Sequence, residues 1–396
     1  MQLTSYRCTL CHKEFRQEEV QYLCPLCSQD YQKGKPLPGV LEVLYDYDAI
    51  AREWHKKPDI ELFSPVETKY YPEIPVGNTP FYQSLRLSNH FSGADIWLKN
   101  DSLNPTGSLK DRASYLVVAE AFRAGYNTIV TASTGNAASA LAAMAAARGL
   151  KAIIFIPADA PPAKIAQIRI YNTQLIEVEG DYDEAFSQAL EYTSLYDGLN
   201  RNTAYHPFTI EGKKTAGLEI FIQNGYRVPD WIIIPVGDGV ILTGIHKAFL
   251  DLMRANISDR LPRILGVQST SSAAIVNYWE TGNYQNADHP QTIADSISVK
   301  TPSNAYWARN CLLECNGAGL TVDDIDILSA QKKLAELTGV FAEPAAAATL
   351  AGLEKAFERD IIGKREQIVL LITGHGLKSL HAKKNIGSNS EQDNNY

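Results

Sequence analysis

Short apolar runs alternate with helix-length segments over most of this chain, and this alternation limits the fold more than any other feature. The runs are rich in Ile, Val and Leu, as in "KAIIFIP" at 151–157 and "DWIIIPVG" at 230–237. Near-continuous apolar runs are typical of strands that are buried on both faces. The segments between them, such as 136–148 and 181–196, have the length of helices. The pattern therefore predicts an α/β architecture with parallel sheets.

The expected strands cover 95–100, 127–133, 151–157, 174–180, 230–237, 263–269 and 367–374. A chain of 396 residues is expected to divide into two or three domains. Its net charge of -8 argues against a nucleic-acid partner or an anionic membrane surface. No apolar run approaches the roughly 18 residues of a membrane-spanning helix, and the first residues lack a secretory pattern. We therefore expect a cytoplasmic protein with no membrane or nucleic-acid partner.

Four of the six cysteines form two CxxC units near the N-terminus. Tetrahedral zinc takes four thiolates, and two CxxC turns supply them with little strain. In a chain without an export signal, this spacing indicates a structural metal site more than disulfides, with redox-active or vestigial cysteines as the alternative. The predicted ligands of a zinc-ribbon-like segment are Cys8, Cys11, Cys24 and Cys27.

The segment "LNPTGSLKDRAS" at 103–114 places one lysine, Lys110, in a turn of small and rigid residues. Ser108 or Thr106 is expected to cap a helix whose first turn contains Lys110. The N-terminus of a helix favours anions, so a lysine there is electrostatically misplaced. Such a lysine can have a lowered pKa or can be consumed as an imine, although most lysines are simply solvated.

Three further segments have a chemical interpretation. "STGN" at 133–136 and "VGDGVIL" at 236–242 each join an apolar run to a helical pattern, where free backbone amides can bind an anion. Thr373 ends the last expected strand, at the sheet edge where open α/β sheets bind ligands. A lysine, two anion-binding turns and a hydroxyl suit a phosphorylated aldehyde cofactor attached to Lys110 as a Schiff base.

These segments resemble a known family. "GNTPF" at 77–81, "LNPTGSLKDR", "ASTGNAAS", "PVGDG" and "ITGHGLK" look like threonine synthase, in the tryptophan-synthase-β group (fold type II) of pyridoxal-phosphate enzymes. After the zinc-ribbon-like segment, which we place at 1–36, we expect a large α/β domain of 37–111 and 209–384 and a small α/β domain of 112–208, as the resemblance implies. The polar composition of 385–396 predicts a disordered tail. Both α/β domains would be open and mostly parallel, and the family is often dimeric.

The resemblance also implies roles for individual residues. Lys110 would carry pyridoxal 5'-phosphate and then move a proton, Asn136 would contact the ring hydroxyl, and Thr373 would face the ring nitrogen. The phosphate of the cofactor would be bound by Gly237, Asp238, Gly239, Val240 and Ile241. The carboxylate of the substrate would be bound by Ser133, Thr134 and Gly135.

The reaction that the resemblance implies converts O-phospho-L-homoserine and water to L-threonine and phosphate. Threonine synthases often carry an arginine shortly before the "EGxKT" element, but Thr209 stands at that place here. The remaining cations that could bind the substrate phosphate are Lys164, Lys213, Lys214 and His206, and the family favours Lys164. We expect the helix that begins near Glu343 to be structural.

Two alternatives follow from the same residues. Because Thr209 is neutral, a β-replacing enzyme similar to cysteate synthase, or a threonine/serine dehydratase, would keep the cofactor and change the substrate. A zinc-ribbon binding protein with a silent catalytic scaffold would lack the cofactor, but the intact Lys110 argues against it.

Overall fold

The computed structural model describes residues 3–158, 162–171 and 173–379, and the expected tail at 385–396 lies outside them. The largest sheet has six strands in the order β12-β11-β10-β13-β5-β4. β4 is antiparallel to β5, and the other neighbours are parallel. The strands are β4 (Phe81–Gln83), β5 (Asp95–Asn100), β10 (Trp231–Pro235), β11 (Arg263–Ser269), β12 (Ala318–Val322) and β13 (Gln367–Ile372).

A second sheet has four parallel strands in the order β8-β7-β6-β9. Its strands are β6 (Thr128–Ala132), β7 (Lys151–Pro157), β8 (Gln174–Val178) and β9 (Leu199–Asn200). All seven expected strands are therefore present, and the predicted α/β class with parallel sheets is confirmed. The short strands β4, β9 and β12 were not expected, because two to five residues carry too little periodicity to be recognised.

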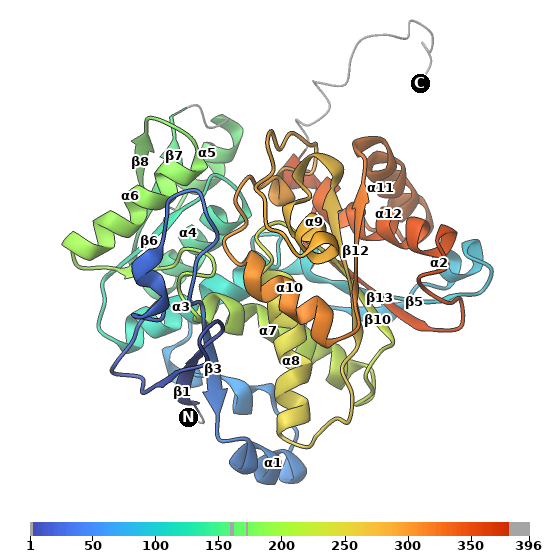
Figure 1. Cartoon of the computed structure of the whole chain (residues 1–396), viewed down its shortest axis with the longest axis horizontal. Helices are drawn as coiled ribbons and strands as arrows, with labels where there is room; N and C mark the ends of the chain where they lie inside the picture. Colours follow the sequence, from blue (N-terminus) through green and yellow to red (C-terminus); the bar gives the residue numbers. More distant parts are fainter. Residues whose placement is uncertain (1–2, 159–161, 172, 380–396) are drawn as a thin grey trace, which may run out of the picture.

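A small antiparallel sheet lies near the N-terminus, in the order β2-β1-β3. Its strands are β1 (Leu3–Cys8), β2 (Glu14–Phe15) and β3 (Leu41–Tyr45). The pairing of β3 with β1 extends this sheet past residue 36, where we expected the first unit to end. The domain boundaries, including the one at residue 36, stay predictions. Figure 1 shows the four-stranded sheet on the left, the six-stranded sheet on the right and this small sheet below them.

Twelve helices surround the sheets in the described residues. They are α1 (Tyr47–Lys56), α2 (Leu85–His90), α3 (Lys110–Arg123), α4 (Asn136–Arg148), α5 (Pro162–Arg169), α6 (Tyr182–Leu195), α7 (Phe208–Gln223), α8 (Val240–Arg254), α9 (Ala274–Thr281), α10 (Ala305–Glu314), α11 (Asp324–Thr338) and α12 (Pro344–Glu358). None of these is both long and apolar enough to cross a membrane.

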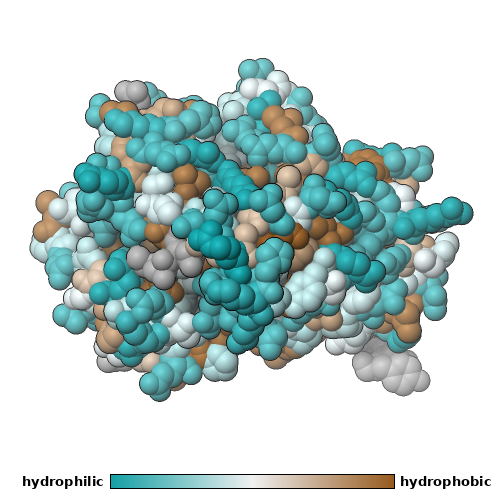
Figure 2. Space-filling view, turned by 90° about the horizontal axis from the view of Figure 1, so that it is seen from below, coloured by the Kyte–Doolittle hydropathy of each residue, from teal (hydrophilic) through white to brown (hydrophobic). Residues whose placement is uncertain are grey.

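Helix α7 packs against both α3 and α8 and so joins the segments that carry the predicted site. The approach to α3 is close at Gly212, where a Cβ atom would lie 2.3 Å from the carbonyl oxygen of Arg112. Only glycine fits there. The central strands β10, β11 and β13 of the large sheet are almost fully buried, as their apolar runs predicted. The face seen in Figure 2 is mostly hydrophilic, with apolar side chains scattered over it.

Candidate active site

The turn before Lys110 is fastened to the segment that follows β13. The backbone N–H of Leu109 donates to the carbonyl of Thr373 over 2.9 Å, and the N–H of His375 donates to the carbonyl of Gly107 over 2.9 Å. The N–H of Lys110 donates to Ser108 Oγ over 3.0 Å, so Ser108 satisfies one free amide of α3 as predicted. Thr106 does not cap the helix.

Thr106 is instead held by the residue that follows Lys110. The N–H and the hydroxyl of Thr106 donate to the two carboxylate oxygens of Asp111, over 2.7 and 2.5 Å. This contact closes the turn on itself, because Asp111 lies in the first turn of α3. The side chain of Lys378 donates to the carbonyl of Thr106 over 2.8 Å and ties the turn to the C-terminal segment a second time. These contacts thus hold the backbone of the turn, and with it Lys110, in a fixed position.

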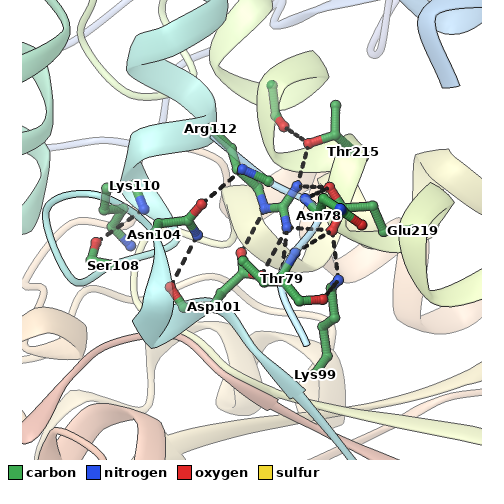
Figure 3. Close-up of polar contacts among 12 residues, drawn as sticks. Asn78, Thr79, Lys99, Asp101, Asn104, Ser108, Lys110, Arg112, Thr215 and Glu219 are labelled. Carbon is green, nitrogen blue, oxygen red and sulfur yellow. Dashed lines mark hydrogen bonds and ion pairs between the residues drawn. The ribbon is translucent and has the colours of Figure 1, made fainter. Parts of the chain in front are cut away.

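A buried ion cluster holds the start of α3 from the other side (Figure 3). The guanidinium group of Arg112 contacts the carboxylates of Asp101 at 2.6 Å and Glu219 at 2.6 Å. Lys99 contacts Glu219 at 2.5 Å, and the N–H groups of Asn78 and Thr79 also donate to Glu219. The "GNTPF" and "LNPTGSLKDR" segments therefore meet at Glu219, a residue of α7.

Lys110 lies in the wall of a cavity of about 500 Å³ between the two large sheets. This volume is typical of sites that bind small molecules. The cavity is also lined by almost all other residues that the sequence predicted for the cofactor and the substrate: Ser133, Thr134, Gly135, Asn136, Gly237, Asp238, Gly239, Val240, Ile241 and Thr373. The four segments come together because the strands before them end at facing edges of parallel sheets.

The half-buried amine of Lys110 has a lowered pKa. Burial lowers it, and the nearby carboxylates of Glu343 and Asp238 oppose this effect only in part. A lowered pKa increases the share of neutral amine, which is the form that attacks a carbonyl group.

The same pKa shift predicts how Lys110 affects stability in cofactor-free protein. In the unfolded chain Lys110 keeps its proton up to the ordinary pKa of 10.5, whereas in the folded chain it loses the proton at a lower pH. Lys110→Met should therefore raise the free energy of unfolding at neutral pH, and this gain should shrink as the pH rises from the folded pKa towards 10.5. Urea denaturation of both proteins across this range measures the difference. A gain that grows with pH would contradict the assignment.

The N-terminus of α8 has the features of a phosphate site. Gly239 precedes the helix with φ of 84°, and no side chain among the described residues caps the helix. A Cβ atom at Gly239 would lie 2.7 Å from the Cβ of Ala308, so the turn requires glycine. The carboxylate of Asp238 accepts from the N–H of Ser303 at 3.1 Å and from its hydroxyl at 3.0 Å. The first amides of the helix therefore remain available for an anion, and the residues fit a phosphate group.

The N-terminus of α4 provides the second anion-binding turn. Gly135 precedes this helix without a side-chain cap among the described residues, and its N–H donates to Ser133 Oγ over 3.2 Å. The side chain of Asn136 donates to the carboxylate of Glu343 over 2.9 Å. Glu343 is buried, and burial raises its pKa. We expected the helix that begins near Glu343 to be structural, although the resemblance places it near the site, and Glu343 lines the same cavity as Lys110.

The cations considered for the substrate phosphate lie in different places. Lys213 lines the cavity, whereas His206 is buried outside it and accepts from the N–H of Phe208. Lys214 is also buried outside the cavity, where it contacts Asp251 at 2.9 Å. Lys164 belongs to α5, but its side chain lies outside the described part of the structure, so its role stays a prediction.

The sequence did not indicate Arg201, which lines the cavity and follows the two-residue strand β9. Arg201 is fully buried, and its Nε donates to Ser114 Oγ over 3.1 Å. Its Nη2 has no hydrogen-bond partner among the residues that the structure describes. A polar "RNT" stretch after so short a strand looks like an ordinary loop, and only the placement of β9 beside β6 reveals it.

The predicted zinc ligands converge at the base of the small N-terminal sheet. Their sulfur atoms all lie within 4.8 Å of one another. The Sγ atoms of Cys8 and Cys27 are 3.7 Å apart, and those of Cys11 and Cys24 are 3.8 Å apart. A tetrahedral zinc with Zn–S bonds of about 2.3 Å separates its sulfur ligands by about 3.8 Å. The four cysteines therefore fit this ion in both number and spacing.

The cysteine-bearing segment also contacts the surroundings of the cavity. The hydroxyl of Tyr22 accepts from the N–H of Asn200 over 3.0 Å, and its ring stacks on that of Tyr205 with centroids 4.5 Å apart. The N–H of Leu37 donates to the carbonyl of Ser303, the residue that binds Asp238. This segment thus supports both β9 and the turn before α8.

Comparison with known sequences identifies the family. A family described as "Pyridoxal-phosphate dependent enzyme" matches residues 73–374. The threonine synthase of Methanosarcina acetivorans is 34% identical over 384 residues, which cover 94% of this chain and 91% of that protein. The threonine synthase of Synechocystis is 36% identical over 328 residues, covering 79% of this chain and 82% of that protein.

Solved structures share the fold at lower identity. A maize serine racemase superposes with a TM-score of 0.67 at 22% identity, covering 83% of this chain and 93% of that one. Threonine deaminase isoform 2 from Solanum lycopersicum also has a TM-score of 0.67 at 23% identity, covering 89% and 95%. The chain belongs to the pyridoxal-phosphate dependent enzyme family and, within it, to the threonine synthases.

Proposed function

We propose that this protein converts O-phospho-L-homoserine and water to L-threonine and phosphate with pyridoxal 5'-phosphate attached to Lys110. The single observation that carries the proposal is the position of Lys110, which shares one cavity with the N-termini of α4 and α8. The threonine synthases named above support the choice of reaction. When bound, the cofactor supplies an electron sink for charge that develops on the substrate.

Different residues of the cavity would bind the cofactor and the substrate. The amides of 237–241 would hold the phosphate of the cofactor at the N-terminus of α8, and Asn136 would contact its ring hydroxyl. Thr373 would face the ring nitrogen. A hydroxyl there does not keep that nitrogen protonated as a carboxylate would, which favours elimination and replacement over transamination. Ser133, Thr134 and Gly135 would bind the carboxylate of the substrate, as the free amides before α4 favour anions.

Lys110 would also move the proton of the reaction. Its Nζ would be the base that takes the proton from Cα of the substrate. The lowered pKa increases the share of neutral amine, which is the form that can accept a proton. The rigid turn at 103–109 would keep Nζ within reach, because both its ends are hydrogen-bonded to the neighbouring segments.

The experiment that tests this proposal measures threonine and inorganic phosphate after addition of O-phospho-L-homoserine. We expect the two products in equal amounts. Turnover of O-phospho-L-serine, L-serine or L-threonine without turnover of O-phospho-L-homoserine would instead support the β-replacing or dehydratase alternative. Protein that stays colourless with added pyridoxal phosphate would contradict the assignment of the cofactor.

We also propose that Cys8, Cys11, Cys24 and Cys27 bind one structural zinc ion. The set is complete without water, so the ion would have no open position for catalysis. It would fix the segment that supports β9 through Tyr22. Cytoplasmic location and a homodimer remain predictions.

Replacement of one ligand tests the zinc site. Cys24→Ser should reduce the zinc content from about one ion per chain to none and lower the thermal midpoint of unfolding, because metal binding contributes directly to folding. Elemental analysis and thermal denaturation measure both effects. Cys315→Ala is the matched control, because Cys315 is also a buried cysteine without a disulfide bond but lies outside the cluster. Full zinc content in Cys24→Ser would contradict the ligand assignment.

A further inference from the structure

Thr209 does not face the cavity, although the resemblance places a phosphate-binding arginine at this position. Its side chain is fully buried. Its hydroxyl donates to the carbonyl of His206 over 2.8 Å and accepts from the N–H of Ala204 over 3.1 Å. Thr209 thus stabilises the turn that begins α7 and contributes no charge. The positive charge that a phosphorylated substrate requires must come from another residue.

Arg201 has the properties of that residue. It lies eight positions before Thr209 in the sequence but lines the cavity directly. Ser114, which accepts from its Nε, lies on α3 four residues after Lys110, so both lie on one face of the helix about 6 Å apart along its axis. The guanidinium group of Arg201 is therefore held beside the first turns of α3, and its charge contributes to lowering the pKa of Lys110.

The burial and the incomplete hydrogen bonding of the Arg201 guanidinium group indicate an anionic ligand. A buried charge without hydrogen-bond partners is costly, and the Nη2 atom of Arg201 has none among the described residues. Burial lowers the pKa of Arg201 to about 10. A ligand with a double negative charge would supply the missing partner, and an arginine binds the oxygens of a phosphate with two parallel hydrogen bonds.

Lys213 adds a second basic group near Arg201. It is buried, lines the cavity, and places its Nζ 3.5 Å from Thr203 Oγ1. Burial, the charge of Lys110 and the charge of Arg201 all lower its pKa. Two cations that repel each other in a closed site are both stabilised when a dianion binds between them.

We infer that Arg201, together with Lys213 and Thr203, binds the phosphate group of the substrate. This inference rests on the proposed function. The other two anion sites of the cavity are already assigned, because the N-terminus of α8 would take the phosphate of the cofactor and that of α4 the carboxylate of the substrate. This chain would thus supply the substrate-binding arginine from the segment that follows β9 and not from the start of α7.

The test uses the holoprotein and the variant Arg201→Gln. Its affinity for inorganic phosphate, measured by calorimetric titration, should fall by more than about 100-fold, as expected for loss of two charge-assisted hydrogen bonds. The KM for O-phospho-L-homoserine should rise by a similar factor. The affinity for L-threonine, which carries no phosphate, and the affinity for the cofactor should stay unchanged.

Two further variants control for charge and folding. Arg123→Gln removes a positive charge from the surface of α3 and should change neither phosphate affinity nor KM. Arg201→Lys keeps the positive charge but loses the paired N–H donors of the guanidinium group. Its phosphate affinity should therefore lie between those of the wild type and Arg201→Gln. This variant keeps the test decisive if Arg201→Gln does not fold.

The outcomes separate this inference from the proposed function. The inference would be overturned if Arg201→Gln bound phosphate as tightly as the wild type. If Arg201→Gln does not fold, wild-type phosphate affinity in Arg201→Lys would overturn it instead. A loss of cofactor affinity as large as the loss of phosphate affinity would also overturn it and assign Arg201 to the cofactor. Failure of the wild type to act on O-phospho-L-homoserine would refute the proposed function. The phosphate titration would still show whether Arg201 binds a phosphate.

Discussion

Lys110→Ala is expected to remove the visible absorbance of the bound cofactor and to reduce turnover by more than about 10³-fold, as expected for loss of a covalent and proton-transferring group. Lys110 is the lysine that the turn at 103–109 fixes in the cavity wall through Ser108 and Asp111.

The matched control for this prediction is Lys213→Met, because Lys213 lines the same cavity. This variant should keep the visible absorbance of the cofactor, since Lys213 is assigned to the substrate. Absorbance spectra of the purified proteins and assays of phosphate release measure both results. Retained absorbance in Lys110→Ala, or loss of absorbance in Lys213→Met, would indicate that Lys213 and not Lys110 carries the cofactor.

Arg112→Met is expected to destabilise the protein by about 3–5 kcal/mol, the usual cost of breaking a buried ion pair. The carboxylates of Asp101 and Glu219 would remain buried without their main partner, because both contact Arg112 at 2.6 Å. Arg123→Met on the same helix removes a contact with Glu120 at the surface, and we expect a loss of about 1 kcal/mol or less. Urea denaturation of cofactor-free proteins measures both changes.

The pH dependence provides a second signature of this ion cluster. Burial opposes the ionisation of Glu219, but Arg112 and Lys99 outweigh it and hold its pKa at about 2, below the ordinary 4.5. The folded state therefore binds this proton less tightly than the unfolded state. The stability from the pair is present above pH 4.5 and is lost as the pH falls towards 2. The difference between wild type and Arg112→Met should shrink over that range, and a constant difference would exclude Glu219 as the partner.

Much of the fold followed from the sequence because its central strands are buried on both faces. The runs at 95–100, 151–157 and 263–269 are strands with the expected bounds. The site segments could be predicted for a related reason. Lys110, Thr373 and the turns before α4 and α8 combine small residues with chemically active ones where a strand or helix begins or ends.

The contacts made by distant residues could not be predicted. The ion pair between Arg112 and Glu219 joins residues 107 positions apart, and neither charge looks unusual in its own segment. Glu343 reads as an ordinary residue before a helix that begins with proline, and only the packing of α12 brings it to Asn136. Arg201 follows a strand of two residues, which is too short to show a period. In each case the partner is set by tertiary packing and not by local sequence.

The attachment of the cofactor to Lys110 is tested most directly by borohydride reduction of the holoprotein followed by mass spectrometry of its peptides. Reduction makes the bond between the cofactor and its lysine permanent, so the modified residue can be identified. We predict one pyridoxyl group per chain, on the peptide that contains Lys110. Modification of Lys213 or Lys378, or of no lysine in protein that binds the cofactor, would contradict this account.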